Sequence, residues 1–563
     1  MIYFPKNYGV CGGANKAISM AISLKDKYKN KNVYIYKEIL HNPFVINDLN
    51  NKNIKCIDNL DVVTKDDILI IRAHGEPKET YEYLDKNGIK YFDATCINVI
   101  NIHNIVKEKY SLGYKIIIIG KKTHPEVLGT NGWCNNEAII LETEDDIKNI
   151  SNKHKYFVVC QTTISSETVT NLTRQLCKMN IDFEFKNTIC KAQSSIADSS
   201  VELAKDMDLM IVIGGKESSN TKELFNACSR FTKSYYFSSL KDFYDFIKNE
   251  NFTYKTKIGI TGGASTPKKQ IDEFKNLLEF VIYYKTKLKE FNKLLKKYNE
   301  SFITYENQLV TKAIKKFNDM NCDGKCLRGC LIDLGYKLSC NNDNYSNALS
   351  IAYETFETSI LIHDDIIDNA TLRRGKQTIP NTYLNEYNDF NVKNDNTHNS
   401  LGICIGDLGF YYCFQIILDN YKNDKNLHKI LTYYNDVVIK TIKGEIIDVE
   451  TPFLEKYDKN HKHNSDDIMQ IYKLKTSWYT IIGPFCLGMI LGNQKKKDIK
   501  EFEQILEPLG IAFQIKDDIL GIYSSKDILG KSVYSDIEEF KQTILYSYIK
   551  TERKDLINDL LKY

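Results

Sequence analysis

The sequence lacks a strong excess of charge, a membrane-length apolar run and an export signal. Its 563 residues include 76 Lys and Arg against 73 Asp and Glu, a net charge of +3, so nothing points to nucleic acid as a main partner. The longest smooth apolar run, residues 480–492, is shorter than the ~18 residues that a spanning helix needs. The N-terminus has no basic start followed by an apolar core and a cleavage site. We therefore expect a cytoplasmic protein with no integral membrane segment.

Proline and closely paired cysteines are also scarce. There are nine prolines, and the fifteen cysteines are scattered without a single CxxC pair. An odd number of cysteines without an export signal argues against a disulfide framework, which leaves a few cysteines as candidate metal ligands. With 42% apolar and 26% charged residues the chain is typical of folded protein, and its length predicts two or more domains.

The two halves of the chain differ in their apolar pattern. Up to about residue 280, short apolar runs that enter polar or Gly-containing turns alternate with helical patterns, which predicts parallel α/β layers. The predicted strands lie within residues 33–39, 67–75, 114–122, 155–163, 208–215 and 257–265. From about residue 291 only long helical patterns follow, which predicts an all-α bundle. We expect an α/β domain over residues 1–284 and a helical domain over residues 285–563, joined by a helix-like segment rather than a flexible linker.

Three cysteines of the first half share a local pattern. Cys11, Cys96 and Cys190 each end a short apolar run and precede a helical stretch, at intervals of 85 and 94 residues. These intervals suggest three related α/β units that each present one thiol at the carboxyl end of a strand. A closed zinc site needs four ligands, whereas three thiolates can hold a 4Fe-4S cluster with one iron open to substrate. Three ordinary buried cysteines are the alternative.

Polar residues that follow other predicted strands indicate a ligand site. Histidines, hydroxyl groups and an amide can together bind a diphosphate without a metal. The set comprises His41, His74, His124, Thr162, Thr163, Ser218, Ser219, Asn220 and Ser265, with the carboxyl group of Glu126 close to His124. Any one of these histidines alone is better explained as a surface or core residue. Their shared position after strands is what favours a site.

Residues 1–280 contain, in this order, the segments GVCGGANKAI, HNPFV, AHG, DATC, THPEV, QTT, NTICKA, SSN and GAST. In combination these segments resemble the LytB family of 4-hydroxy-3-methylbut-2-enyl diphosphate reductases. The resemblance implies a three-unit α/β trefoil around a 4Fe-4S cluster held by Cys11, Cys96 and Cys190. It implies removal of an allylic hydroxyl group, the last step of the methylerythritol phosphate pathway, to give isopentenyl and dimethylallyl diphosphates. Glu126 would deliver protons with the help of Thr162 and His124, and a ferredoxin or flavodoxin would supply electrons. The residues implied in substrate binding are His41, His74, His124, Thr162, Ser218, Ser219, Asn220 and Ser265.

Two acidic clusters lie in helical patterns of the second half. Asp364, Asp365 and Asp368 occur in LIHDDIIDN, where residues i and i+4 share a helix face, and Asp517 and Asp518 occur in FQIKDDILG. Apolar residues flank both clusters, and charges in such surroundings are costly unless they are paired or bound to metal. Carboxylates on facing helices suit Mg²⁺. The accompanying basic residues, which indicate a pocket for two diphosphates, are Lys325, Arg328, Arg373, Arg374, Lys475 and Lys531.

The order GKxxR, DDxxD with RRG, KT, FQxxDD and GK, between about residues 305 and 550, is similar to that of the trans-isoprenyl diphosphate synthases, the polyprenyl synthetase family. The resemblance implies an all-α bundle, often dimeric, in which about three Mg²⁺ ions ionise an allylic diphosphate that isopentenyl diphosphate then attacks. Asp364, Asp365, Asp368, Asp517 and Asp518 would bind Mg²⁺. Arg373, Lys475 and Lys531 would bind the allylic diphosphate, and Lys325, Arg328 and Arg374 isopentenyl diphosphate. Thr476 and Gln514 would stabilise the cation.

Several positions depart from the family pattern. Glu357 stands where His or Gln is usual, Glu445 where Gln is usual, and Gly521 where the fullest motif has a third Asp. The small Ser359, five residues before the first Asp, favours a product of C15–C20 or longer, with Phe356 as a candidate stop.

We expect a bifunctional isoprenoid enzyme, because the products of the first half are substrates of the second. Two alternatives stay open. Only the reductase half could be active, with the second half a degenerate prenyl-binding module, or the chain could be a non-catalytic iron–sulfur redox sensor.

Overall fold

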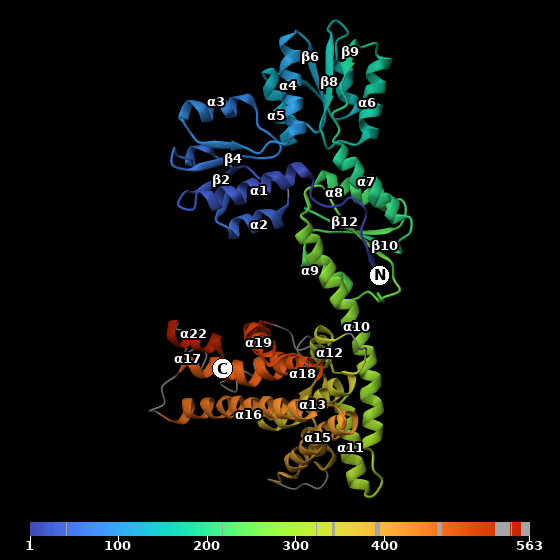
Figure 1. Cartoon of the computed structure of the whole chain (residues 1–563), viewed down its shortest axis with the longest axis vertical. Coiled ribbons are helices and arrows are strands. Elements are labelled where there is room, and N and C mark those ends of the chain that lie inside the picture. Colours follow the sequence, from blue (N-terminus) through green and yellow to red (C-terminus); the bar gives the residue numbers. More distant parts are fainter. Residues whose placement is uncertain are drawn as a thin grey trace. The chain divides into compact units, whose positions relative to one another are not determined.

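The structure, a computed structural model, describes the chain except for residues 41, 217, 323, 341–343, 389–394, 459–463, 524–540, 542 and 553–563. The chain divides into two units, Met1–Tyr283 (the N-terminal unit) and Tyr284–Tyr563 (the C-terminal unit), which are labelled by element in Figure 1. The helix-like join expected from the sequence is confirmed, because α10 (Lys268–Phe302) is one continuous helix.

Three four-stranded parallel sheets form the N-terminal unit (Figure 1). In sheet order, the first contains β1 (Ile2–Tyr3), β12 (Ile258–Gly262), β10 (Leu209–Ile213) and β11 (Lys233–Phe237). The second contains β3 (Ile54–Ile57), β2 (Val33–Tyr36), β4 (Ile68–Ile71) and β5 (Tyr91–Asp93). The third contains β7 (Ile139–Leu141), β6 (Lys115–Ile119), β8 (Tyr156–Cys160) and β9 (Phe183–Phe185). The two central strands of each sheet are the six strands that the sequence predicts, and the six edge strands are additional.

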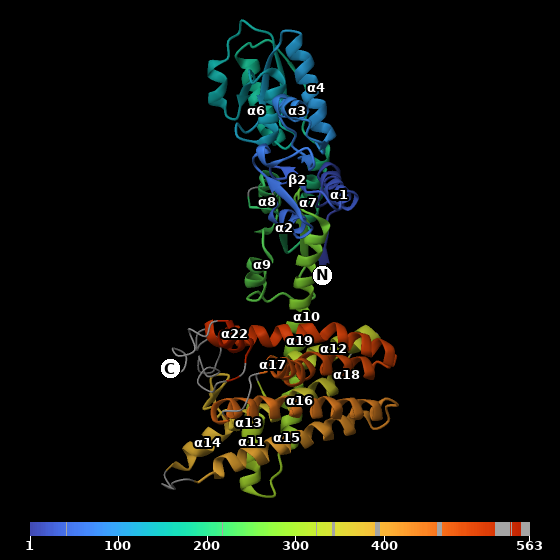
Figure 2. The same cartoon turned by 90° about the vertical axis from the view of Figure 1, so that its left-hand side faces the viewer.

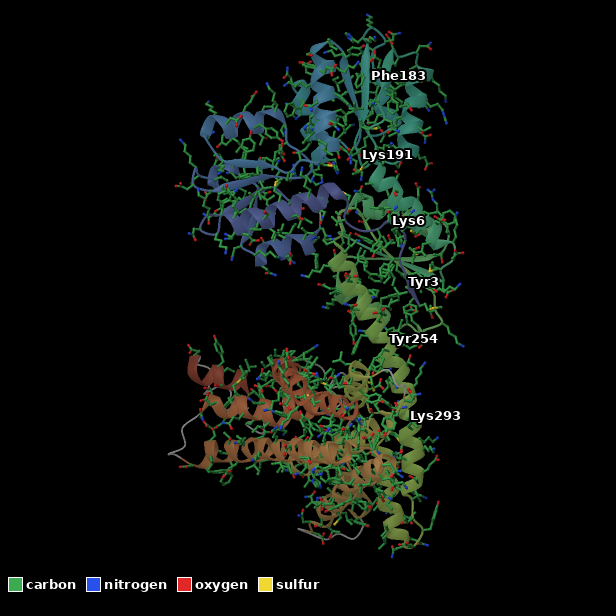
Figure 3. All side chains as sticks on the ribbon, in the orientation of Figure 1. Tyr3, Lys6, Phe183, Lys191, Tyr254 and Lys293 are labelled. Carbon is green, nitrogen blue, oxygen red and sulfur yellow. The ribbon has the colours of Figure 1, made fainter. Side chains whose placement is uncertain are left out.

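Helices connect these strands and cover the sheets, as expected for parallel α/β layers. They are α1 (Gly12–Lys27), α2 (Pro43–Asn51), α3 (Lys78–Asn87), α4 (Ile97–Ser111), α5 (Pro125–Asn131), α6 (Ser166–Lys178), α7 (Lys191–Ala204), α8 (Ser219–Ser229) and α9 (Leu240–Ile247), with short 3₁₀ turns at Leu60–Val62, Gly132–Cys134 and Glu144–Asn149. Lys191, labelled in Figure 3, is the first residue of α7. Small residues of α1 and branched residues of the second sheet, among them Ala17, Ala21 and Ile35, are fully buried and form one of the cores.

The described part of the C-terminal unit is almost entirely helical. Its helices are α11 (Gln308–Met320), α12 (Leu327–Ser339), α13 (Asn347–Ile367), α14 (Ile379–Glu386), α15 (Thr397–Tyr421), α16 (Leu427–Tyr457), α17 (Ser465–Ile471), the π-helix η5 (Tyr472–Ile482), α18 (Gly483–Leu491), α19 (Lys496–Tyr523) and α22 (Ile544–Glu552). The expectation of helices alone is wrong at one place, where β13 (Leu372–Arg373) and β14 (Lys376–Gln377) form an antiparallel hairpin. Arg374 and Gly375 both have positive φ (54° and 76°), which matches the tight turn that joins such strands.

Helices α16, η5 with α18, and α19 run side by side in the C-terminal unit (Figure 2). Glycines let neighbouring backbones approach. A Cβ atom at Gly444 of α16 would lie 2.4 Å from the backbone nitrogen of Lys475 in η5, and one at Gly488 of α18 would lie 2.0 Å from the carbonyl oxygen of Ile332 in α12. These contacts fix η5 against α16 and α18 against α12.

One described helix, α15, is long and apolar enough to cross a membrane by length and composition, which the sequence reasoning did not anticipate. The same helix packs along α13 and also contacts α14 and α11. These contacts account for only part of its apolar composition, because 39% of its most apolar stretch is buried.

Replacement of Gly488 by Ala is expected to destabilise the C-terminal unit by about 2 kcal/mol, because the new methyl group overlaps the carbonyl oxygen of Ile332 and outweighs the better helix propensity of Ala. Calorimetric unfolding measures this loss. Leu338→Ala on α12 is the control, since Leu338 is 55% exposed and its change should stay within about 0.5 kcal/mol. Equal melting of G488A and wild type would contradict the close α12–α18 packing.

Candidate active sites

One cavity in the N-terminal unit is lined by Cys11, Cys96 and Cys190 together. All three are free thiols, and each is the N-cap residue of a helix, of α1, α4 and α7 in turn. Each cysteine also donates its backbone N–H to a carbonyl in the loop after a central strand. The acceptors are Ala264, Ala73 and Thr162, at 2.9, 3.0 and 2.8 Å. The same connection is therefore made three times around one cavity.

The surroundings of the thiols suit an iron–sulfur cluster. Helix N-termini favour thiolates, and Ala14 donates its N–H to Cys11 Sγ at 3.5 Å. Burial, together with the charges of Cys96 and Cys190, nevertheless raises the pKa of Cys11, so a bound cation would relieve a real cost. A Cβ atom on Gly13 would lie 2.7 Å from Cys96 Sγ, and glycine thus keeps space for this thiol. Among the described residues no three His, Cys, Asp or Glu side chains converge on one metal ion. A four-iron cluster spreads its thiolate ligands over several irons, and three thiols around one cavity fit that group.

Glu126 lies in the wall of the same cavity, on α5, whose N-cap is His124 and whose first residue is Pro125. The carboxyl group of Glu126 accepts two hydrogen bonds from Thr162, one from the backbone N–H at 2.6 Å and one from Oγ1 at 2.7 Å. Burial raises the pKa of Glu126 to about 7, although the two bonds from Thr162 lower it. At neutral pH the protonated and ionised forms of Glu126 are therefore present in similar amounts, which suits a proton donor.

The other predicted reductase residues with described side chains line the same cavity, namely His74, His124, Thr163, Ser218, Asn220 and Ser265. The rings of His74 and His124 meet edge to face at 5.7 Å. Ser265 Oγ is buried without a hydrogen-bond partner among the described residues, so it can donate to a ligand. His41 and the side chain of Ser219 lie outside the described part of the chain.

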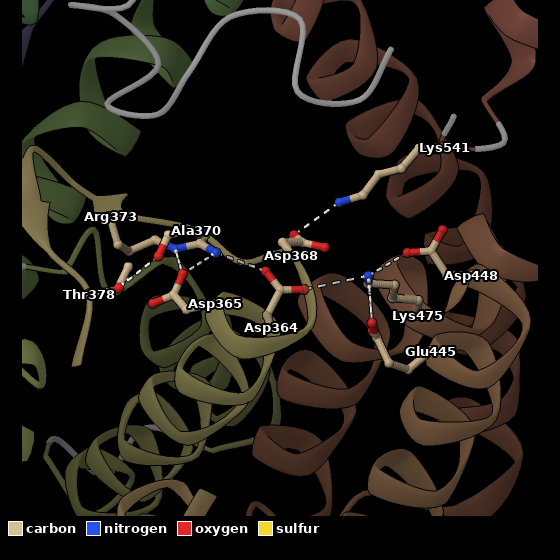
Figure 4. Close-up of polar contacts among 10 residues, drawn as sticks. All are labelled: Asp364, Asp365, Asp368, Ala370, Arg373, Thr378, Glu445, Asp448, Lys475 and Lys541. Atoms are coloured by element: carbon tan, nitrogen blue, oxygen red, sulfur yellow. Dashed lines mark hydrogen bonds and ion pairs between the residues drawn. The ribbon is translucent and has the colours of Figure 1, made fainter. Parts of the chain in front are cut away.

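In the C-terminal unit the first acidic cluster lies at the end of α13 and contacts three cations (Figure 4). Arg373 donates from Nε to Asp365 at 2.7 Å and from Nη2 to Asp364 at 2.9 Å. Lys541 Nζ lies 3.0 Å from Asp368. Lys475 Nζ lies 3.6 Å from Asp364, and 2.9 and 2.6 Å from two further carboxylates of α16, those of Glu445 and Asp448.

These carboxylates differ in acidity. Burial alone would raise the pKa of Asp364, but Lys475 and Arg373 hold it below its usual value. Burial raises the pKa of Asp365 to about 7 against the effect of Arg373. Burial and the charge of Asp364 raise the pKa of Asp368. The cluster thus carries negative charge that suits a metal ion. Arg373, Lys475 and Lys541 balance this charge in the structure.

The π-helix η5 connects this cluster to the second one. Besides Lys475 it provides Thr476, which donates to Gln514 Oε1 at 2.5 Å, and Tyr472, which donates to Asp518. Gln514 in turn donates to Asp518 at 2.7 Å. π-Helical turns are frequent at functional sites, and this one carries Lys475, which contacts the first cluster, and Tyr472, which contacts the second.

The remaining predicted synthase residues lie as follows. Arg328 and Arg374 both contact Glu357, with N–O distances of 2.8 and 3.4 Å. The side chains of Lys325 and Asp517 are exposed, and Lys531 lies outside the described residues. Among the described residues no three carboxylates converge on a single metal ion. The carboxylate oxygens of both clusters are nevertheless of the kind that Mg²⁺ binds.

Comparison with known proteins assigns both units. The family model described as LytB protein matches residues 2–279, and that described as polyprenyl synthetase matches residues 310–562. The 4-hydroxy-3-methylbut-2-enyl diphosphate reductase of Caldanaerobacter subterraneus is 37% identical over 276 residues, which cover 48% of this chain and 94% of the relative. That of Clostridioides difficile is 37% identical over 280 residues, 49% of this chain and 99% of the relative. The chain belongs to the LytB family. In it, a LytB protein is fused to a polyprenyl synthetase.

A geranylgeranyl pyrophosphate synthase from Corynebacterium glutamicum is among the similar solved structures, with 22% identity and a TM-score of 0.45 over 50% of this chain and 80% of that one.

Sequence reasoning missed several residues of both sites. In the LytB unit, Asn42 caps α2 and donates to the backbone oxygen of Ser265 at 2.9 Å. In the polyprenyl synthetase unit, Asp448 and Lys541 join the acidic cluster. Asp448 lies one turn after Glu445 on the same helix face, and this spacing could have revealed it. Lys541 had no such signal, because it comes from far along the chain.

Replacement of Glu126 by Gln is expected to change the pH dependence of stability. Between pH 4.5, the usual pKa, and pH 7 the folded protein keeps a proton that the unfolded chain has lost. Wild type therefore loses stability as pH rises through this window, by about 3 kcal/mol in all. Glu126→Gln lacks this loss, so its stability relative to wild type should increase between pH 4.5 and 7 and stay level above. Urea unfolding across this range measures it, with exposed Glu82→Gln as control. If the free energies of unfolding of wild type and E126Q change with pH in parallel, the raised pKa of Glu126 is contradicted.

Proposed function

We propose that the chain is a bifunctional isoprenoid enzyme, with a reductase domain over residues 1–284 and a prenyl transferase domain over residues 285–563. The reductase, built as a three-unit trefoil, would convert 4-hydroxy-3-methylbut-2-enyl diphosphate to isopentenyl and dimethylallyl diphosphates. The transferase would join isopentenyl diphosphate to allylic diphosphates. The observation that carries the proposal is the cavity where three cysteines, each tied to a neighbouring strand-end loop, surround a space that Glu126 also lines.

For the reductase, Cys11, Cys96 and Cys190 would hold a 4Fe-4S cluster, which when bound would pass electrons one at a time from an external donor to the substrate. The substrate's C–O bond breaks, two electrons from that donor and two protons enter, and water leaves. Glu126 would give a proton to the departing hydroxyl, and its pKa of about 7 supports this role, since it leaves much of the carboxyl group protonated at neutral pH. The two hydrogen bonds from Thr162 fix the orientation of this carboxyl group.

The diphosphate would be held by hydroxyl, amide and imidazole groups. Ser265 Oγ, buried without a partner among the described residues, can donate to a phosphate oxygen. Ser218, Asn220 and His74 line the same cavity, and His41 and Ser219 complete the set proposed from the sequence. A ferredoxin or flavodoxin is the proposed electron donor.

For the transferase, Asp364, Asp365, Asp368, Asp517 and Asp518 would hold Mg²⁺, which stabilises the leaving diphosphate when bound. Arg373 and Lys475, now paired with carboxylates, would turn to the allylic diphosphate together with Lys531. Thr476 and Gln514, which bond to each other, would present oxygen dipoles to the cation. We also propose a homodimer through this domain.

An apolar cavity of about 640 Å³ begins at Asp364 and is lined by residues of α13, α15 and α16, among them Ile360, Phe410, Ile442 and Ile446. It suits a prenyl chain. Ser359, whose small side chain was expected to leave room for a long chain, packs against Gly409 instead of lining the cavity. Ile360 takes the lining position. Phe356 lies behind Phe410, with ring centroids 5.6 Å apart. We propose products of C15–C20 or longer.

The full chain, purified without oxygen and given the hydroxylated substrate, a chemical reductant and Mg²⁺, should form both C5 diphosphates and then longer prenyl diphosphates. Glu126→Gln should lower reductase kcat at least about 100-fold, the usual scale of a lost general acid, while iron content and cluster absorbance stay those of wild type. Unchanged kcat in E126Q would refute the proton-donor role. A protein that binds iron but reduces no substrate would favour the redox-sensor alternative.

Asp364→Asn should lower prenyl transfer from an allylic primer and isopentenyl diphosphate at least about 100-fold, because it removes a metal ligand at the leaving diphosphate. Chelation of Mg²⁺ should have the same effect, and reductase activity should survive both treatments. Exposed Asp419→Asn of α15, which does not line the proposed prenyl cavity, is the matched control. Absence of prenyl product from wild type with any primer would identify the C-terminal unit as a degenerate prenyl-binding module.

A further inference from the structure

Glu357 lies between the two arginines proposed to bind isopentenyl diphosphate. Its Oε1 is 2.8 Å from Arg328 Nη1 and 3.4 Å from Arg374 Nη2. The three side chains come from three elements, α13, α12 and the turn between β13 and β14. Glu357 and Arg328 are only 10% and 15% exposed. A single carboxylate therefore occupies both guanidinium groups in a largely buried place.

The position of Arg328 is fixed independently of Glu357. Its Nη2 donates to Thr480 Oγ1 at 3.0 Å, and its guanidinium lies 4.1 Å from the centre of the Tyr479 ring. Its Nε is buried without a hydrogen-bond partner among the described residues. Arg328 thus stays in place when Glu357 is changed, and it has a donor left for a ligand.

The neighbouring groups leave the negative charge on Glu357. Glu354, one turn earlier on α13, accepts the backbone N–H of Gly329 at 2.6 Å. Burial, followed by the charge of Glu357, raises the pKa of Glu354 well above its usual value, whereas Arg328 and Arg374 outweigh burial and lower that of Glu357. The other titratable groups that interact with Glu357 are Tyr353, Tyr479 and Cys326. Two guanidinium charges are therefore reduced to one net positive charge.

We propose that Glu357 keeps the affinity for isopentenyl diphosphate low, because its carboxylate competes with the diphosphate group for Arg328 and Arg374. This inference rests on the proposed transferase function. The diphosphate must displace the carboxylate from both arginines or bind beside a like charge, and either costs binding free energy. Glu357 lies seven residues before Asp364 and is not placed to touch the reacting atoms. Its effect therefore falls on KM for isopentenyl diphosphate rather than on kcat.

Glu357→Gln tests this, since Gln keeps the shape and removes the charge. In the full chain, E357Q should bind isopentenyl diphosphate about tenfold more tightly in Mg²⁺-free calorimetry, as expected when a charged competitor is lost. Its KM should fall to match, with kcat within about twofold. Binding in the reductase cavity is common to both proteins and cancels in the comparison. Glu357→Asn provides a second uncharged variant in case E357Q does not fold.

Glu354→Gln is the matched control. Glu354 bonds Gly329 and, held in its neutral form, Glu357. Gln is also neutral and keeps these contacts, so the affinity of this variant should equal that of wild type. In an Arg328→Gln background the gain in affinity from E357Q should be smaller, because one of the two arginines for which Glu357 and the diphosphate compete is absent. Equal or weaker binding by E357Q, or an equal gain in E354Q, would overturn the inference even if wild type makes prenyl product. Tighter binding by E357Q without any product would instead support the inference and refute the transferase function.

Discussion

The N-terminal unit depends on placing three thiols around one space, where burial and the charges of the neighbouring cysteines disfavour the thiolate form that binds metal, as the raised pKa of Cys11 indicates. Three backbone hydrogen bonds, from Cys11, Cys96 and Cys190 to the loops that follow β12, β4 and β8, meet this constraint. Because each cysteine also caps a helix, the same residue fixes a helix start, a link between two neighbouring strand ends of one sheet and a thiol position. The loops so connected carry Ser265, His74 and Thr162, which places the proposed substrate groups by the same bonds.

The C-terminal unit meets a similar electrostatic constraint, since its buried groups are carboxylates. Removing a partner from a buried charge is costly, and Asp364, Asp365 and Asp368 are each paired with a cation. The cations come from the hairpin, from η5 and from Lys541, so the cluster links segments that are distant in sequence. Close approach of η5 at Gly444 puts Lys475 within reach of α13 and α16. Packing and charge compensation therefore support each other here.

The sequence predicts those features of the structure that a local pattern of residue types determines, and it does not predict those that depend on contacts between distant segments. The central strands other than β2 are almost wholly buried and read as continuous apolar runs, such as Ile68–Ile71. In β2 buried and half-buried residues alternate, and all six strands were predicted. Four of the six edge strands are only two or three residues long, and the longer Lys233–Phe237 is partly polar, so no local pattern marks them. The cysteines and aspartates were found because their spacing matches helix starts and helix faces. The contacts of Lys541 with Asp368 and of Glu357 with Arg374 depend on tertiary packing, and sequence spacing does not encode them.

Under the proposed function, the two sites hold the same kind of anion by different means. No Lys or Arg is among the described residues lining the thiol cavity, whereas the C-terminal unit surrounds its site with arginines and lysines. Isopentenyl diphosphate would then leave a site lined by hydroxyl, amide and imidazole groups and enter one rich in arginine and lysine. Glu357 lessens this difference, which suits a site whose substrate is made on the same chain and whose product must also leave.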